Sequence, residues 1–165
     1  MKKIIVIGCP GSGKSTFATG LHRITGIPLF HLDLMFWNPD RTTVDRETFR
    51  ARLSEVMAQD AWIMDGNYAS TMEMRMQACD TVVFLDYPTD VCISGIMERR
   101  GRERPDLPWI EPDKVDTEFL EFVKAYNEQS RPTVLELLRT YSDKTILVFT
   151  SRREADEYLA RLGNL

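Results

Sequence analysis

The segment GCPGSGKST, from Gly8 to Thr16, has the residue types and spacing of a phosphate-binding loop. It satisfies the pattern G-x-x-x-x-G-K-[ST] and lies between an expected strand and an expected helix. Glycines let consecutive backbone N–H groups turn inward, and the helix N-terminus adds positive charge, so the loop suits a β-phosphate. Lys14 is expected to reach the β- and γ-phosphates, Ser15 to ligate Mg²⁺ and Thr16 to support the α-phosphate. The candidate nucleotide-binding residues are Gly8, Pro10, Gly11, Ser12, Gly13, Lys14, Ser15 and Thr16.

Two aspartates follow short apolar runs farther along the chain, Asp65 in WIMDG and Asp86 in VVFLD. Mg²⁺ at phosphate sites keeps several waters, and a carboxylate at a strand end can hold them by hydrogen bonds. Aspartate also favours turns, so either residue could simply end its strand. Both are candidates for organising a magnesium ion through water.

Four arginines gather between residues 99 and 104 in a chain whose formal net charge is −4. Phosphoryl transfer needs cations around the transferred group, and the planar guanidinium suits them. Glycine and prolines make residues 99–112 a lid-like loop, with a merely solvated charged loop as the alternative. Arg131, beside Pro132, is a weaker candidate for the same work. The predicted catalytic cations are Lys14, Arg99, Arg100 and Arg131.

Asp33 ends the second expected strand, where three roles are open to it. It could accept a proton from a substrate hydroxyl, anchor the acceptor, or cap the following loop. Trp37 and Tyr68 lie in loops at the same presumed edge and could stack on a base or sugar. Phe36 could do the same or pack in the core, and His31 is expected to be a satisfied core histidine.

Short apolar runs alternate with helical patterns along the whole chain. The expected strands cover residues 2–8, 27–33, 61–66, 81–88 and 144–150, and the expected helices 14–23, 45–60, 70–78, 88–100, 113–139 and 151–162, with a break at Pro132. This order predicts an α/β three-layer sandwich with a five-stranded parallel sheet and right-handed crossovers. Ligands in such sheets bind beyond the carboxyl ends of the strands, where the glycine loop, Asp33 and both candidate aspartates fall.

Composition narrows the class further. The 165 residues, 43% hydrophobic and 28% charged, predict one globular domain over residues 1–165, with an acceptor-side helical region at 34–60. The net negative charge argues against nucleic acid as a partner. The opening apolar run, Ile4 to Ile7, is too short for a membrane span, and three cysteines without a paired framework favour the cytoplasm. The sequence carries no signal for the oligomeric state.

The glycine loop, WIMDGNY and the arginine pair after the fourth expected strand resemble the adenylate kinase and nucleoside monophosphate kinase group of P-loop proteins. In that group an FLLDGFP-like strand takes the place of WIMDGNY, and its aspartate organises the magnesium waters. The resemblance therefore ranks Asp65 before Asp86. It also implies a short arginine-rich lid bearing Arg99 and Arg100, with Arg102 or Arg104.

The resemblance is closer to a bacterial set known as DNA topology modulation proteins, also described as adenylate kinase-like. It rests on HLDxxxW at 31–37, DGNY at 65–68 with Arg75 in the next helix, RGRxRPD at 100–106 and SRP at 130–132. The chain departs from true adenylate kinases in lacking the DGFPR arginine, so the acceptor stays open. Asp33 also resembles the acceptor-contacting aspartate of shikimate and gluconate kinases. The candidate acceptor-binding residues are Asp33, Trp37, Asn67, Tyr68 and Arg75.

Together these features predict an ATP- and Mg²⁺-dependent kinase that acts on a small-molecule or nucleotide acceptor. One alternative is a nucleotide-binding regulatory protein without kinase chemistry, with a link to DNA topology. A GTPase is disfavoured because no NKxD motif occurs in the chain.

Overall fold

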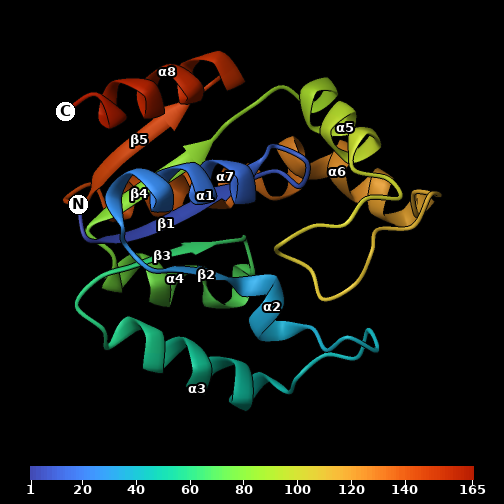
Figure 1. The fold of residues 1–165 in the computed structure, drawn as a ribbon, viewed down its shortest axis with the longest axis horizontal. Helices are drawn as coiled ribbons and strands as arrows, with labels where there is room; N and C mark the ends of the chain where they lie inside the picture. Colours follow the sequence, from blue (N-terminus) through green and yellow to red (C-terminus); the bar gives the residue numbers. More distant parts are fainter.

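Five parallel strands form a single sheet in the order β2-β3-β1-β4-β5 in this computed structural model, which describes residues 1–165 (Figure 1). The predicted five-stranded parallel sheet is confirmed. The chain passes from central β1 to the β2 edge, returns through β3, and then continues on the far side of β1. Such a reversal of strand order creates a crevice at the carboxyl ends of the strands. The strands are β1 (Lys3–Gly8), β2 (Leu29–His31), β3 (Trp62–Asp65), β4 (Thr81–Leu85) and β5 (Thr145–Phe149).

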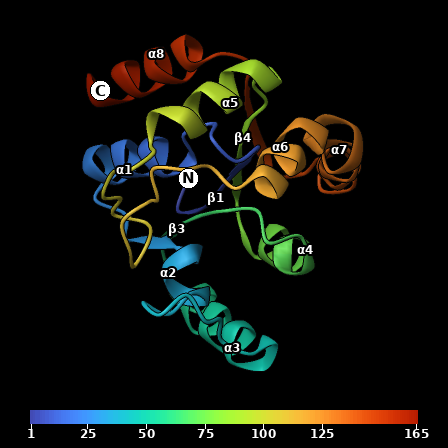
Figure 2. The ribbon, with the colours of Figure 1, turned by 90° about the vertical axis from the view of Figure 1, so that its right-hand side faces the viewer.

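Helices cover both faces of the sheet and complete three layers (Figure 2). Alternate residues of β1 serve opposite faces: Ile4 and Val6 join one buried cluster, whereas Ile5 and Ile7 join the other. The first cluster packs against α1, α5, α6 and α8, and the second against α2, α3, α4 and α7. The helices are α1 (Lys14–Thr25), α2 (Leu32–Phe36), α3 (Arg46–Met57), α4 (Ala69–Ala78), α5 (Thr89–Glu98), α6 (Thr117–Gln129), α7 (Arg131–Thr140) and α8 (Arg152–Gly163).

Local sequence sets several helix ends. Asp45 accepts a hydrogen bond from the Thr48 N–H at 2.7 Å and caps α3, and Ser151 caps α8. The predicted break near Pro132 separates α6 from α7, and it falls just before Arg131 because proline fits the first turn of a helix. No helix combines the length and the apolar character that a bilayer span requires.

The structure differs from the prediction around Asp33. Strand β2 stops at His31, and residues 32–36 form the short helix α2 instead of continuing a strand into a loop. Leu32 is fully buried, and Met35 and Phe36 pack against the same cluster at helical spacing. Asp33 therefore lies in the first turn of α2, two residues beyond the end of β2.

Residues 99–116, between α5 and α6, contain no helix or strand and approach α2 (Figure 1). We call this segment the lid. Its Trp109 contacts Trp37 with ring centroids 5.5 Å apart at 90°, and the Arg41 guanidinium lies 5.5 Å from the Trp109 ring centroid. The lid therefore joins the loop after α2 through aromatic contacts.

Candidate active site

The loop between β1 and α1 presents unpaired hydrogen-bond donors. Gly11 and Gly13 have φ of 85° and 90°, left-handed values that turn the backbone inward. Gly13 is the N-cap of α1, and no side chain caps this helix, so its first N–H groups are available to a ligand. The buried hydroxyl of Ser12 also has no hydrogen-bond partner. These features fit the oxygens of a nucleotide phosphate.

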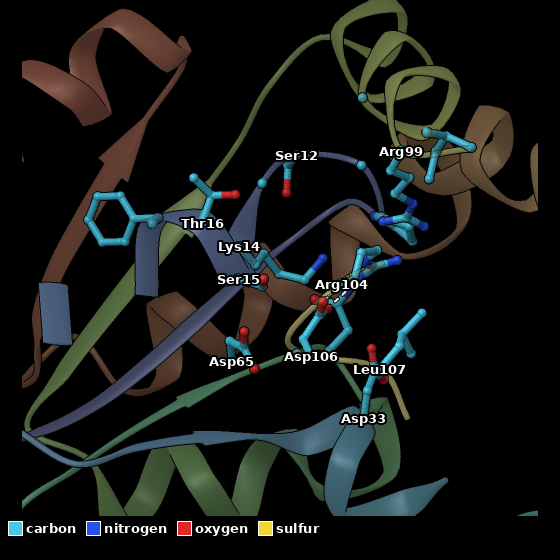
Figure 3. Close-up of a pocket in the computed structure, with 18 of the residues that line it drawn as sticks. Ser12, Lys14, Ser15, Thr16, Asp33, Asp65, Arg99, Arg104, Asp106 and Leu107 are labelled. Atoms are coloured by element: carbon cyan, nitrogen blue, oxygen red, sulfur yellow. Dashed lines mark hydrogen bonds and ion pairs between the residues drawn. The ribbon is translucent and has the colours of Figure 1, made fainter. Parts of the chain in front are cut away.

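Lys14 folds over this loop, with Nζ at 3.0 Å from the Gly8 carbonyl and 3.2 Å from the Cys9 carbonyl. Burial lowers the pKa of Lys14, whereas the nearby carboxylates of Asp33 and Asp65 raise it. The ammonium lies in the cavity together with both carboxylates (Figure 3). The cavity has a volume of about 1630 Å³, which is more than a single small ligand usually occupies.

Two contacts that the sequence did not predict hold the loop in place. The Asn67 amide donates to the Gly8 carbonyl at 2.7 Å and accepts from the Gly8 N–H at 3.1 Å. On the other side, a Cβ built on Gly95 of α5 would lie 2.0 Å from the Gly11 carbonyl oxygen. The sequence signal for this close approach of two backbones is Gly95 itself, a glycine inside an otherwise helical pattern.

Asp65 lines the cavity with Ser15, as Figure 3 shows, and its Oδ2 lies 2.7 Å from His31 Nδ1. Burial lowers the pKa of His31, but the hydrogen bond and charge of Asp65 outweigh this and raise it above its ordinary value. The satisfied histidine predicted from the sequence is thus paired with a carboxylate of the candidate site. Such a partner fixes the orientation of a carboxylate that holds metal-bound water.

Asp86 and Arg131 form a pair elsewhere. Arg131 Nε and Nη2 each lie 2.8 Å from one oxygen of the Asp86 carboxylate, and neither residue lines the cavity. Of the two candidate aspartates, Asp65 lines the cavity at the glycine loop and Asp86 does not. It also corrects the expected catalytic position of Arg131, because its guanidinium is held by the carboxylate that follows β4.

Asp33 enters the cavity from α2, and Tyr68 donates a hydrogen bond from its hydroxyl to Oδ1 of this carboxylate. No backbone N–H donates to the Asp33 carboxylate, so capping of the following loop is excluded. Burial raises the pKa of Asp33, and the charges of Asp106 and Asp65 add to the rise, while Tyr68 and Lys14 oppose it. A half-buried carboxylate with a raised pKa suits proton transfer.

The candidate acceptor residue Arg75 lies outside the cavity and is fully buried. Its guanidinium donates to the carbonyls of Gly66 at 3.1 Å, Tyr68 at 3.3 Å and Asn67. This segment needs support because Gly66 and Tyr68 have φ of 123° and 39°. Arg75 therefore holds the turn that carries Asn67 and Tyr68, which corrects the expected contact with the acceptor.

The lid arginines differ from one another. Arg104 donates from Nε at 3.0 Å and from Nη2 to Asp106, and from Nη1 to Glu111. Arg99 Nε lies 3.4 Å from Glu111, whereas the exposed Arg100 donates to the Met97 carbonyl at 3.0 Å. All three arginines line the cavity. The acidic partners were missed because nothing in the charge run indicates which residues pair.

The fold has known counterparts. A crystal structure of shikimate kinase from Bacteroides thetaiotaomicron is similar with a TM-score of 0.58 and 22% identity, over 98% of this chain and 96% of that one. An unliganded sugar kinase from Janibacter sp. HTCC2649 is similar with a TM-score of 0.58 and 18% identity, over 98% and 91% of the two chains. No protein-family model and no curated protein matches. The chain thus has the P-loop fold of these kinases, while the relationship to DNA topology modulation proteins stays a prediction.

Proposed function

We propose that this protein is an ATP- and Mg²⁺-dependent kinase that transfers a phosphoryl group to a hydroxyl of a small acceptor. One observation carries the proposal: Lys14 of the glycine loop and the half-buried carboxylate of Asp33 share one cavity. A phosphate-binding loop alone would support any nucleotide-binding function. The Asp33 carboxylate adds a group that can accept a hydroxyl proton. The folds of the shikimate kinase and the sugar kinase support the same class.

The residues divide the chemistry between them. The glycine loop, from Gly8 to Thr16, binds the phosphates through backbone N–H groups, and Lys14 neutralises charge on the β- and γ-phosphates. Ser15 would ligate Mg²⁺ directly and Asp65, oriented by His31, would hold it through water. No group of three or more His, Cys, Asp or Glu side chains is placed to hold a metal, so phosphates and water would supply most ligands. When bound, Mg-ATP would supply the γ-phosphoryl group, and its Mg²⁺ would screen the negative charge of the phosphates.

Asp33 acts on the acceptor. Its ionised carboxylate orients the acceptor hydroxyl and takes the proton as the oxygen attacks, and its raised pKa strengthens it as a base. Tyr68 fixes the carboxylate through the hydrogen bond to Oδ1, and Trp37 borders the acceptor. Asn67 and Arg75 act indirectly by fixing the turn between the glycine loop and Tyr68. Arg99 and Arg100 place positive charge over the transferred group when the lid excludes water.

The test is ADP release from Mg-ATP across nucleoside monophosphates, nucleosides and small hydroxylated metabolites. We expect turnover with at least one acceptor, and a loss of about 10³-fold in Lys14→Ala because the transferred charge loses its cation. Lys124→Ala is the matched control, since Lys124 is exposed on α6 and pairs only with Glu121. Full turnover in Lys14→Ala would exclude the glycine loop as the catalytic site. ATP binding with no ADP release from any acceptor would instead favour a nucleotide-binding regulator.

A further inference from the structure

The part of the cavity around Asp33 differs in charge from the part around the glycine loop. We call it the acceptor end and define it by residues that line the cavity: Asp33, Trp37, Arg41, Tyr68, Arg104 and Trp109. If the protein is a kinase, as proposed above, this end receives the phosphoryl acceptor. Its charges and its walls therefore indicate which acceptors fit.

The partly buried guanidinium of Arg104 at the acceptor end is already hydrogen-bonded through all three of its nitrogens. Nε, Nη1 and Nη2 of Arg104 each donate to a carboxylate oxygen, two to Asp106 and one to Glu111. Glu111 also pairs with Arg99 at 3.4 Å, so this group contains two positive and two negative charges. An anionic acceptor would have to break these charge-assisted bonds to obtain a partner.

The other charged groups around the acceptor end do not supply a positive charge for an anionic acceptor. Asp33 adds a half-buried negative charge, which repels a phosphate or a carboxylate placed beside it. Arg75 is outside the cavity and donates to backbone carbonyls. Arg41 is exposed, and its guanidinium lies against the Trp109 ring at 5.5 Å from the centroid. Apart from Arg99, which the proposed function assigns to the transferred group, no partly buried guanidinium at this end remains for the bidentate binding of an anion.

Aromatic rings form the walls of the same space. Trp37 and Trp109 meet edge to face with centroids 5.5 Å apart, and Phe36 packs on Tyr68 at 5.0 Å. These rings come from α2, the loop after it, the turn after β3, and the lid. Aromatic faces of this kind bind flat rings with an apolar face, while nearby polar groups fix their orientation.

We propose that the acceptor is an uncharged, ring-bearing polyol, either a nucleoside or a cyclic sugar, and not a phosphate or a carboxylate. The corner of Trp37 and Trp109 holds the ring, and Asp33 receives the hydroxyl that reacts. The hydroxyl oxygen forms a bond to the γ-phosphorus while the bond between that phosphorus and the β–γ bridging oxygen breaks. The hydroxyl proton passes to Asp33, and ADP is the leaving group.

The experiment compares neutral acceptors with anionic derivatives that keep the same ring, using the full chain with saturating Mg-ATP. One pair is adenosine and its 5′-monophosphate, and the other is glucose and glucuronate. We expect kcat/KM for the neutral member of at least one pair to exceed that of its anionic partner by about 10²-fold. Faster turnover with adenosine would identify the acceptor as a nucleoside, and faster turnover with glucose would identify it as a sugar. Equal or faster use of the anionic member would overturn this inference and leave the kinase proposal standing, whereas no ADP release from any acceptor would remove both.

Variants of the aromatic wall give a second readout. Trp109→Ala should raise KM for the neutral acceptor about tenfold with little change in KM for ATP, and Trp109→Phe should restore most of it. Ile110→Ala is the control, because Ile110 is the exposed neighbour of Trp109 in the lid. Arg41→Ala should raise the same KM less than Trp109→Ala does. A larger effect of Arg41→Ala than of Trp109→Ala would show that the acceptor is bound as an anion and would overturn the proposal.

Discussion

The phosphate-binding loop and the acceptor end are built in different ways. The loop is one stretch of nine residues that leads into the uncapped N-terminus of α1, and its function depends on glycine conformations at Gly11 and Gly13. The acceptor end is assembled from side chains of three separate segments, represented by Asp33, Tyr68 and Trp109. A backbone nest needs only local sequence, whereas a side-chain pocket needs the whole fold to bring its members together.

The two regions also treat charge differently. The loop offers unpaired donors, including the buried Ser12 hydroxyl, which a phosphate can satisfy. At the acceptor end two lid arginines, Arg104 and Arg99, are balanced by two lid carboxylates, Asp106 and Glu111. The phosphate-binding loop therefore suits an anion, whereas the charges of the acceptor end cancel apart from those of Asp33 and Arg41. Each variant below changes a residue that belongs to one region, supports it or flanks it. The measurements then show which function depends on that residue.

Among the variants below, the largest effect is expected at the acceptor end. Asp33→Asn keeps the size of the side chain but cannot take a proton, so kcat should fall by about 10²- to 10³-fold. ATP affinity, measured by titration calorimetry, should change less than about twofold because the phosphate-binding loop is intact. Asp40→Asn is the matched control, since this aspartate is exposed in the loop after α2 and only bonds Thr42. An unchanged kcat would show that Asp33 is not the base.

The pH dependence of the same variant follows from the direction of the Asp33 pKa shift. Burial raises this pKa, so the folded protein binds a proton more tightly than the unfolded chain does. Asp33 thus favours the folded state below the unfolded pKa, about 3.9, and loses that contribution as pH rises through the folded pKa. Asp33→Asn should therefore stabilise the protein at pH 7, with a gain in unfolding free energy that shrinks towards pH 4. In the wild type, kcat/KM should fall as pH decreases through the raised pKa.

A smaller effect is expected where α5 supports the phosphate-binding loop. In Gly95→Ala the new Cβ would meet the Gly11 carbonyl oxygen at 2.0 Å, so the loop and helix must separate. We expect ATP affinity to fall about tenfold and stability to fall by about 2 kcal/mol in denaturant unfolding, as for other overpacked sites. Gly163→Ala is the control, because its nearest neighbour is Ile24 at 3.7 Å. Normal ATP affinity in Gly95→Ala would mean that the loop does not depend on this contact.

The same contrast explains what could be predicted from the sequence. The β1 run from Ile4 to Ile7 is fully buried, and apolar runs of this kind identify central parallel strands without knowledge of their neighbours. The sequence predicts Asp33 at the correct edge of the sheet but assigns it to a strand, because Leu32 continues an apolar run. In the structure Leu32 packs as part of helix α2. The partners of Arg104 and Gly95 depend on contacts between elements, which periodicity does not contain.

The smallest effect is expected at Arg131, which the sequence suggested as a catalytic cation. Its guanidinium is about one-third exposed and holds Asp86 outside the cavity. Arg131→Ala should change kcat less than twofold and lower the unfolding free energy by about 1 kcal/mol, because solvent screens a pair of this exposure. Arg131→Lys should recover part of the stability but not the bidentate geometry. A fall in kcat of about 10²-fold in Arg131→Ala, of the size expected when a transition-state contact is lost, would instead mean that Arg131 leaves Asp86 and reaches the transferred phosphate during turnover. The separation of the two regions would then hold only for the ligand-free protein.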